Sequence, residues 1–599
     1  MKQILKNANI IDVEDLSIKL RNIIIENGEI IDILPITETI PENRNIIDLK
    51  NQYISPGFIE AHLHIESSMM PPLEFAQYSV KHGTTCAFVD PHEIANVYGK
   101  EGIDLWIKQS KLSPMDIFIG IPSCVPATHL EHSGAEIKVE DIKDYLKKFE
   151  KEKDYIYGLG EMMNFPGIIH GFGDAREKVD IAISAGKIVD GHCPGISGED
   201  LLSYVSNGKM DGIVRIKSDH ESTTASEVIE KIKAGMYIAL RYGSATRDLD
   251  RILPDLIESN IDFQRIMLCS DDLSPSELYN RGHVDRIIKQ ARDIFLEKTR
   301  FSLEKATCKA ISLATLNPGK YIEPFLNRSK RLPIGKIAKG YKANLVVFKT
   351  LESIDISKVI YNGEIVVIDN NLQNKIPKYD YSKFLNSINI SHKITPEDFI
   401  IPYTGKKNIV KINVIQTTPI SLITKHIKEE CAVVEKKGKR QIISDPENDL
   451  LKIAVFERHH NTGFHSIGLI KGIGIKNGAI ASTIAHDNHN LIIIGTDDES
   501  MAKLANIMRE KGGGMAALWN DQLTYFALPI AGLMSYDPIE NIVSNYDNVK
   551  KAARNMGSEI ENVFMTMSFM ALAVIPEIKI TDMGLVNVNS FKIIDLIEE

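Results

Sequence analysis

Eight short apolar runs, each ending in polar or small residues and followed by a helix-like stretch, constrain the fold of this chain more than any other feature. Buried strands that alternate with helices are typical of a parallel sheet. Eight such units within residues 56–331 match the strand number and the size, about 250 residues, of a TIM-type (β/α)8 barrel. The runs are Phe58–Ala61, Thr85–Val89, Ile117–Ile121, Tyr155–Leu159, Lys187–Val189, Gly212–Ile216, Tyr237–Leu240 and Arg265–Cys269.

The segments that flank the barrel carry the signs of short strands and tight turns. Asn27-Gly28 and Asn362-Gly363 are each a hairpin signal. We therefore expect residues 1–55 and 332–370 to pair into one small β-sandwich-like domain. A polar stretch over residues 369–395 is interpreted as a linker. Residues 396–599 contain strands and helices of their own, which predicts an additional α+β C-terminal domain.

Composition and charge limit the classes of partner that this chain can be expected to bind. The net charge of −10 would repel a phosphate backbone, and no stripe of Lys and Arg offsets it, so we expect no nucleic-acid partner. No apolar run approaches the ~20 residues of a membrane span, and the N-terminal residues show no signal-peptide pattern. The six cysteines form no close pair, which favours a reducing cytoplasm. We expect a cytoplasmic homo-oligomer that acts on a small molecule.

Groups able to bind a metal follow almost every predicted strand. In a barrel of this type the chemistry lies at the C-terminal ends of the strands. In His62-Leu-His64 the two imidazoles point to the same side, because side chains alternate along a strand, so both can bind one ion. The residues at the strand ends are His62 and His64, then Asp90, His92 and Glu93, then Glu161, His192, His220 with Glu221, and Ser270 with Asp271.

The predicted ligands are a mixed set of imidazoles and carboxylates: His62, His64, Glu161, His192, His220 and Asp271. Such a set suits Zn²⁺, Fe²⁺ or Mn²⁺. A carboxylate such as Glu161 can bridge two ions about 3.5 to 4 Å apart, which predicts a binuclear centre. A hydroxide held by the ions would be the nucleophile, with Asp271 placed to orient it and to accept its proton. This chemistry is hydrolysis without a covalent intermediate.

With these residues the chain resembles the amidohydrolase superfamily, and within it the adenine deaminases of the bacterial and archaeal type. The resemblance covers nearly the whole chain. In the barrel it rests on Pro56-Gly-Phe-Ile-Glu-Ala-His-Leu-His-Ile-Glu-Ser-Ser68, Val89-Asp-Pro-His-Glu-Ile-Ala-Asn96, Gly160-Glu-Met-Met-Asn-Phe-Pro166, Asp190-Gly-His192, Ser218-Asp-His-Glu221 and Ser270-Asp-Asp272. Beyond the barrel it rests on Gly478-Ala-Ile-Ala-Ser-Thr-Ile-Ala-His-Asp-Asn-His-Asn490 and Leu528-Pro-Ile-Ala-Gly-Leu-Met534, which look like the C-terminal domain peculiar to that family.

The resemblance implies hydrolysis of adenine to hypoxanthine and ammonia, as in purine salvage or adenine catabolism, with two Mn²⁺ or Fe²⁺ ions and Zn²⁺ as the alternative. Many amidohydrolases use a carboxylated lysine as the bridging ligand, whereas this family has glutamate, here Glu161. Adenine C6 is an amidine-like carbon, so attack is easier when a ring nitrogen is protonated, and departing ammonia also needs a proton. Glu93 and Asp271 are our candidates for these proton transfers.

Other residues near the strand ends are expected to bind the substrate or to support the ligands. Asp90 and His92 share one loop and take one of these two roles. Glu66 and Glu221 lie near proposed ligands, where a carboxylate commonly orients an imidazole. Arg241 and Ser270 complete this group. After the seventh run, Arg241-Tyr-Gly-Ser244 departs from the Arg-Glu-Gly-Ser of many relatives, so a role for that acidic position does not carry over.

Some alternatives remain open on the sequence alone. The C-terminal histidines His459, His460, His465, His486 and His489 either pack a domain interface, bind another metal, or lean over the barrel mouth. The same metal site serves many leaving groups, so another amidohydrolase, acting on a cyclic amide or a different aminopurine, is the alternative enzyme. A barrel that serves only as a scaffold is the contrasting class, but such proteins typically lose ligands, and here none of the six is missing.

Overall fold

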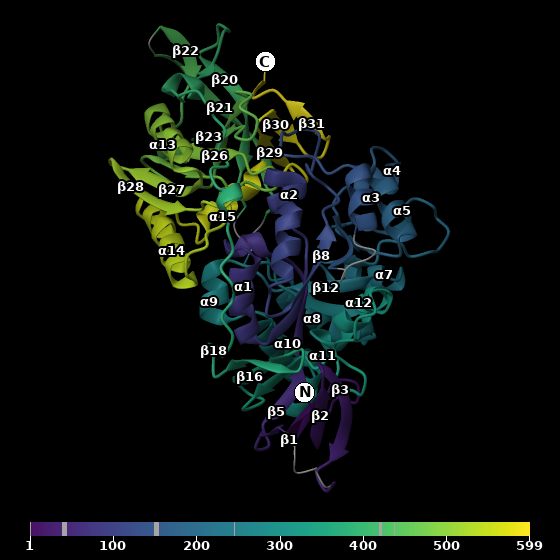
Figure 1. Ribbon diagram of the computed structural model, residues 1–599. Coiled ribbons are helices and arrows are strands. Elements are labelled where there is room, and N and C mark those ends of the chain that lie inside the picture. Colours follow the sequence, from purple (N-terminus) through teal and green to yellow (C-terminus); the bar gives the residue numbers. More distant parts are fainter. Residues whose placement is uncertain are drawn as a thin grey trace.

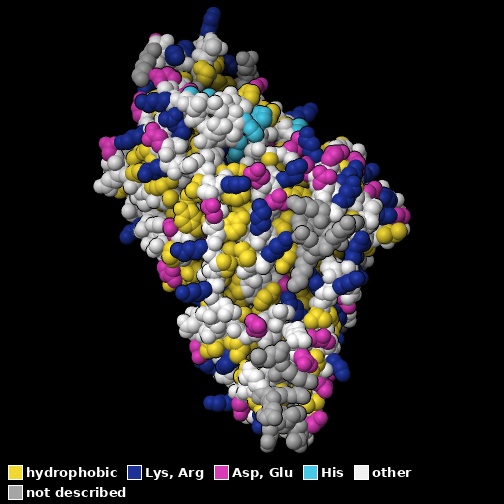
Figure 2. Space-filling model, viewed as in Figure 1, with side chains coloured by type: hydrophobic (Ala, Val, Ile, Leu, Met, Phe, Trp, Pro, Cys, Tyr) yellow, Lys and Arg dark blue, Asp and Glu magenta, His cyan; other side chains and the backbone are white. Residues whose placement is uncertain are grey.

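The computed structural model describes residues 2–38, 45–148, 155–244, 246–418, 422–436 and 438–598. Figure 1 shows an N-terminal sheet at one end of the molecule, parallel strands with their helices in the middle, and a C-terminal sheet at the other end. Basic and acidic side chains are interspersed over the face drawn in Figure 2. Within the described ranges, we find no helix with the length and apolar character needed to cross a bilayer.

The middle of the molecule is built on parallel strands. One sheet contains β6 (Phe58–His64), β7 (Thr84–Val89), β8 (Asp116–Ile121), β9 (Ile156–Met162) and β10 (Ile188–Gly191), with the two-residue β14 (Asp271–Asp272) on the other side of β6. A second sheet contains β11 (Ser218–Asp219), β12 (Tyr237–Arg241) and β13 (Ile266–Cys269). All of these neighbours pair in the parallel sense, as the alternating sequence pattern predicts.

Two connections join these sheets. The backbone N–H of Lys217, just before β11, donates to the carbonyl of Val189 in β10 at 2.9 Å. At the other side, β13 runs through Ser270 into β14, so one segment pairs first with β12 and then with β6. The parallel strands therefore follow one another around the middle of the molecule.

One predicted strand is wrong. The run Gly212–Ile216 lies outside the strands, and the strand at this place is the two-residue β11. The backbone N–H groups of Arg215 and Ile216 both donate to the carbonyl of Val205, at the end of helix α6. The apolar run is therefore bound to a helix end rather than to a neighbouring strand, and Ile213 within it is exposed.

Helices cover the outside of the parallel strands. In α8, the buried residues Leu249, Ile252, Leu253 and Leu256 recur at helical spacing and pack toward β12. The helices of this region are α1 (Pro72–Ser79), α2 (His92–Ser110), α3 (Val139–Lys148), α4 (Phe165–His170), α5 (Ala175–Ser184), α6 (Gly198–Val205), α7 (Ala225–Lys233), α8 (Asp248–Glu258), α9 (Pro275–Arg281), α10 (Val284–Lys298), α11 (Leu303–Leu313) and α12 (Leu316–Arg328).

Residues 56–331, where the barrel is predicted, are called the barrel region below. The segments before and after it share one sheet of nine strands. Its strands are β1 (Lys2–Asp12), β2 (Ser17–Glu26), β3 (Glu29–Pro35), β4 (Asn45–Asp48), β5 (Tyr53–Pro56), β15 (Leu345–Phe348), β16 (Ile356–Tyr361), β17 (Glu364–Ile368) and β18 (Asn371–Leu372). The two flanks meet where β15 pairs antiparallel with β5. Asn27 and Gly28 both have positive φ, 52° and 81°, in the turn between β2 and β3, which is why this pair suits a tight hairpin.

The C-terminal region contains a larger, mostly antiparallel sheet, a smaller sheet, and helices. The larger sheet contains β19 (Ile401–Pro402), β20 (Ile409–Gln416), β21 (Lys425–Lys436), β22 (Lys439–Ile442), β23 (Leu451–Phe456), β24 (His465–Lys471), β25 (Ala479–Ser482), β26 (Leu491–Gly495), β27 (Gly514–Trp519), β28 (Gln522–Ala527) and β32 (Ile597–Glu598). A smaller sheet contains β29 (Ile578–Thr581), β30 (Gly584–Asn587) and β31 (Lys592–Ile594). The helices are α13 (Asp498–Lys511), α14 (Ile539–Asn555) and α15 (Val563–Ser568).

Hydrogen bonds of the loop between β25 and β26, residues 483–490, connect the C-terminal region to the barrel region. Asn488 Nδ2 donates to Glu131 Oε2 at 2.8 Å, and Asn490 Nδ2 donates to the carbonyl of His132 at 2.9 Å. The side chains of Asn488, Glu131 and Asn490 are buried, whereas His132 is half-buried. This contact brings the C-terminal loop against the ends of the parallel strands that carry the predicted ligands.

Candidate metal centre

The six predicted ligand residues come from five strand ends and meet in one place. His62 and His64 lie on β6, Glu161 on β9 and Asp271 on β14, while His192 and His220 directly follow β10 and β11. All except the half-buried His192 are buried. Parallel strands end at the same edge, so the fold places these groups together. Which of them bind a metal stays a prediction.

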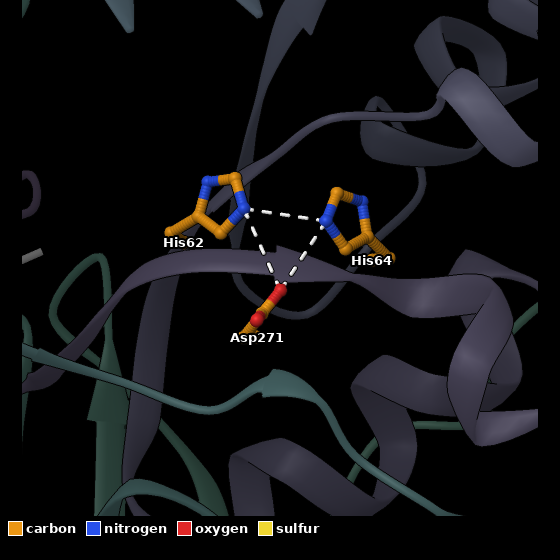
Figure 3. Close-up of side chains that lie close together, drawn as sticks. All are labelled: His62, His64 and Asp271. Carbon is orange, nitrogen blue, oxygen red and sulfur yellow. Dashed lines mark hydrogen bonds and ion pairs between the residues drawn. The ribbon is translucent and has the colours of Figure 1, made fainter. Parts of the chain in front are cut away.

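His62, His64 and Asp271 form one side of the cluster, and Figure 3 shows their side chains pointing toward one another. The two Nε2 atoms are 3.3 Å apart. Asp271 Oδ1 lies 3.8 Å from His62 Nε2 and 3.4 Å from His64 Nε2. Three nitrogen and oxygen atoms this close together, from buried side chains, form a donor set that suits a transition metal.

Glu161 lies at the centre of the cluster. Its Oε1 is 3.2 Å from His64 Nε2, and its Oε2 is 2.7 Å from His192 Nδ1 and 3.2 Å from His220 Nε2. The two oxygens of one carboxylate thus face different histidines. Burial opposes the ionisation of Glu161, but the charge of His192 and the hydrogen bonds of the surrounding imidazoles hold its pKa well below the usual range.

Asp90 holds two residues of the cluster, His64 and Glu161, in place. His64 Nδ1 lies 3.0 Å from the carbonyl oxygen of Asp90, so Nδ1 donates to this oxygen and Nε2 is the ring nitrogen that faces the cluster. Asp90 Oδ2 accepts the backbone N–H of Glu161 at 2.8 Å. A Cβ at Gly160 would lie only 2.2 Å from Asp90 Oδ2, so glycine is needed there. These contacts favour the supporting role for Asp90 over contact with the substrate.

Asp271 has an unusual backbone and a buried positive partner. Its φ is 57°, in the left-handed region that aspartate tolerates better than most residues. Arg241 Nη1 lies 3.2 Å from Asp271 Oδ2, and Arg241 also bonds Glu221 and, through Nε at 2.9 Å, Asp248. Burial raises the pKa of Asp271, but the hydrogen bond to His64 and the charges of His220 and Arg241 lower it well below the usual range. The carboxylate is therefore ionised.

His92 lies closer to the cluster than the sequence suggested. Its Nδ1 is 3.4 Å from Glu161 Oε1, and His64, His92 and Glu161 together form a group that could hold a metal ion. His92 Nδ1 is buried and has no hydrogen-bond partner among the described residues. Its position at the start of α2, directly after β7, was the available signal. Sequence reasoning assigned it to substrate contact or support, not to the ligands.

Glu93 is bound by two histidines of the C-terminal region. Glu93 Oε1 lies 2.6 Å from His486 Nδ1, and Glu93 Oε2 bonds His489 Nε2. The backbone N–H of Ala485 donates to His489 Nδ1 at 3.3 Å, so Nε2 carries the proton that His489 donates to Glu93. His486 and His489 therefore lie against Glu93 near the ends of the parallel strands, and the three side chains form a group that could hold a metal ion, so the role of this pair stays a prediction.

The other C-terminal histidines have different contacts. His460 Nε2 lies 2.9 Å from the carbonyl of Ser133, which makes it part of the contact between the two regions. His459 Nε2 lies 2.7 Å from the carbonyl of Asn488, and His465 stacks on Phe456. His486 and His489 lie in the motif that ends at Asn490, but their contact with Glu93, almost 400 positions away, could not be predicted from that motif.

The remaining predicted residues lie at the edge of the cluster. Glu221 Oε1 is 3.7 Å from His220 Nε2. Glu66 Oε1 accepts the backbone N–H of Ile94 at 3.2 Å, rather than an imidazole, and its Oε2 has no hydrogen-bond partner among the described residues. The backbone N–H of Ser270 donates to Glu60 at 3.0 Å, and the Ser270 hydroxyl is buried without a partner in the same part of the chain.

A largely apolar cavity adjoins the cluster, between the barrel region and the C-terminal region. From the barrel side it is lined by Glu66, Met69 and Glu93, and from the C-terminal side by His486, Met515 and Phe564, among others. His92 links it to the candidate metal centre, because His92 Nε2 is 3.6 Å from Glu93 Oε1 and Nδ1 contacts Glu161. A few polar groups in an apolar wall are typical of a small-molecule site.

Two family models match the sequence. The amidohydrolase family matches residues 53–366, and the adenine deaminase C-terminal domain matches residues 421–592. An adenine deaminase from Desulfatibacillum aliphaticivorans is 38% identical over 99% of this chain and 97% of the relative. One from Methanothrix thermoacetophila is 39% identical over 93% and 91%. One from Thermosipho melanesiensis is 39% identical over 100% and 97%.

Proposed function

This chain belongs to the adenine deaminase family of amidohydrolases, and from that premise we propose that it hydrolyses adenine to hypoxanthine and ammonia. The observation that carries the proposal is the position of Glu161, whose two oxygens face His64 on one side and His192 and His220 on the other. Such a carboxylate suits the bridging position between two metal ions.

The donor set fits two divalent transition metals, Mn²⁺ or Fe²⁺, with Zn²⁺ as the alternative. The residues that would hold them are His62, His64, Glu161, His192, His220 and Asp271, and the imidazole of His92 lies within reach of the same set. When bound, the metals would lower the pKa of a coordinated water and so provide a nucleophile at neutral pH.

Side chains of the protein transfer the protons of the reaction. Water adds to adenine C6, the bond from C6 to the amino nitrogen breaks, and the nitrogen leaves as ammonia. Asp271 accepts a proton from the attacking water and delivers it toward the departing nitrogen. Arg241 holds the Oδ2 side of Asp271, which leaves Oδ1 free to face the reacting atoms. Glu93 is the second candidate for proton transfer, at the wall of the adjoining cavity.

The architecture of the family supports a closed barrel. We propose that the two parallel sheets are parts of one (β/α)8 barrel over residues 56–331, a reading favoured by the bond between Lys217 and Val189 and by the pairing of β14 with β6. Residues 1–55 with 332–370 would then be the small β domain, and residues 396–599 the C-terminal domain. We also propose that the enzyme works as a homo-oligomer in the cytoplasm, which suits the six buried, unpaired cysteines.

The test is steady-state release of ammonia from adenine, adenosine, guanine and cytosine, with hydrolysis of dihydroorotate measured alongside, using protein loaded with Mn²⁺. We expect adenine to be the preferred substrate by a large margin in kcat/KM. Activity on dihydroorotate alone would assign the chain to a different amidohydrolase reaction. Preference for adenosine or guanine would mean that the chain is a deaminase but that adenine is not its substrate.

A further inference from the structure

We propose that the C-terminal domain completes the substrate site, with His486 donating a hydrogen bond from its Nε2–H to a ring nitrogen of the purine inside the cavity between the two domains. This inference rests on the proposed function and names one residue that reads the base. It makes His486 a substrate-binding residue and makes Glu93 and Phe569 the groups that position it.

Two neighbours fix the His486 ring. Glu93 Oε1 lies 2.6 Å from Nδ1, so this nitrogen donates to the carboxylate. Phe569 stacks on the ring with centroids 4.4 Å apart and planes 17° from parallel. Nε2, the other ring nitrogen, has no hydrogen bond or ion pair with the described residues, and His486 lines the cavity. A fixed ring with one free N–H is a ready donor for a bound ligand.

Glu93 also keeps that ring charged. Burial lowers the pKa of His486, but the carboxylate of Glu93 outweighs this effect and raises the pKa to about 9. His489 donates its own N–H to the other oxygen of Glu93, which fixes the carboxylate in place. A charged donor makes a stronger hydrogen bond than a neutral one, which suits recognition of a ring nitrogen.

Glu66 supplies the complementary acceptor in the same cavity. Its side chain is buried, with only 3% of the residue exposed, and Oε2 has no donor among the described residues. A buried carboxylate oxygen without a donor is costly, so its presence in a cavity indicates that a ligand provides the N–H. Adenine carries N–H groups next to ring nitrogens that accept. His486 and Glu66 both line the cavity, so they offer a donor and an acceptor to a bound base.

The apolar wall of the cavity consists of side chains of the kind that contact an aromatic ring. Met69 comes from the barrel region, while Met515, Leu533 and Phe564 come from the C-terminal region. Thioether and aromatic side chains make favourable contacts with the flat faces of an aromatic ring. Because both regions contribute, neither would hold the base alone.

The test uses ring-nitrogen deletions as competitive inhibitors. Inhibition constants of 1-deazaadenine, 3-deazaadenine and 7-deazaadenine are measured on the Mn²⁺-loaded wild type, on His486→Ala, and on His392→Ala, which removes an exposed histidine outside the cavity. We expect one analogue to bind the wild type about 10- to 100-fold more weakly than the others, because it lacks the nitrogen that accepts from His486. That difference should shrink to about 3-fold or less in His486→Ala and persist in His392→Ala.

Equal discrimination among the analogues in the wild type and in His486→Ala would overturn the inference. The wild-type reaction separates this outcome from failure of the proposed function, because a wild type that releases no ammonia from adenine would refute the function itself. A crystal structure of the unmodified protein with hypoxanthine gives a readout that does not depend on the folding of a variant. We expect a purine ring nitrogen within hydrogen-bond distance of His486 Nε2, and a purine bound away from His486 contradicts the proposal.

Discussion

Arg241 Nη1 lies 3.2 Å from Asp271 Oδ2, on the opposite side of the carboxylate from Oδ1, which faces His62 and His64. One oxygen of Asp271 thus belongs to the candidate metal centre and the other to a buried guanidinium. Arg241 also bonds Glu221 and Asp248, so one guanidinium contacts three carboxylates around the site, of which Asp248 pairs with Arg251 as well. Arg241 is therefore the group that sets the orientation of Asp271.

Replacement of Arg241 tests this role. Arg241→Leu leaves three carboxylates without their common partner, so we expect kcat/KM to fall about 100-fold or more and the melting temperature to drop. Arg241→Lys should recover only part of the loss, because an ammonium cannot reproduce the fork of a guanidinium. Arg247→Leu, which removes an exposed arginine paired with Glu277, is the control. A folded Arg241→Leu variant with wild-type kcat/KM would exclude the role.

Loss of a single imidazole tests the ligand set. We expect His62→Ala to lose metal and activity together, with bound metal falling from about two equivalents per chain to one or fewer. His170→Ala removes an exposed histidine outside the cluster and should change neither quantity. Metal content by mass spectrometry, with ammonia release on the same samples, is the measurement. Unchanged metal content in His62→Ala would remove this residue from the ligands.

The contact between Asn488 and Glu131 tests the coupling of the two domains. Asn488→Ala leaves the buried Glu131 carboxylate without the amide that donates to it, so we expect about 1 to 3 kcal/mol of lost stability. Because Asn488 is two residues from His486, KM for adenine should rise more than kcat falls. Asn477→Ala, at an exposed pair with Asn520, is the control for urea unfolding and kinetics. A loss of stability with an unchanged KM would separate docking from substrate binding.

The buried Lys579 makes the free energy of unfolding depend on pH. It lies in β29, donates to the carbonyl of Leu422 at 2.9 Å, and burial lowers its pKa from the ordinary value of 10.5 to about 7. Between these two values the unfolded chain binds more protons than the folded one, so the free energy of unfolding rises with pH, by up to about 1.4 kcal/mol per unit. Below pH 7 both states are protonated and this contribution stays at its minimum.

The variant Lys579→Met removes this dependence. We expect its urea midpoint to exceed that of the wild type at pH 7 and the difference to shrink as the pH rises to 9. Lys503→Met, at an exposed lysine, should show no such convergence. Parallel midpoints of wild type and Lys579→Met from pH 7 to pH 9 would contradict the buried, deprotonated lysine.

The sequence predicts the parallel strands well where the pattern is local. Strands such as β7 and β8 are buried on both faces, so their apolar runs mark them directly. The failure at Gly212–Ile216 has a tertiary cause, because the N–H groups of Arg215 and Ile216 bond the end of α6. The resemblance to adenine deaminases, read from motifs, is confirmed by the relatives that match over nearly the full chain.

The candidate site, like the fold, could be predicted from the sequence only in part. The candidate ligands follow strand ends, so their convergence can be expected from the fold. The partners of Glu93 could not be found in this way, because His486 and His489 lie almost 400 positions further along the chain. The contacts of Arg241 with three carboxylates could not be predicted either, since these come from β14, from the loop after β11 and from the start of α8.

The most direct test of the central claim is a titration of metal-free protein with Mn²⁺, with the rate of ammonia release from adenine as the readout. If Glu161 joins two ions, activity should be absent in the stripped protein and should rise until about two equivalents per chain are bound. Full activity without metal would contradict the account, and saturation at one equivalent would remove the binuclear centre on which it depends.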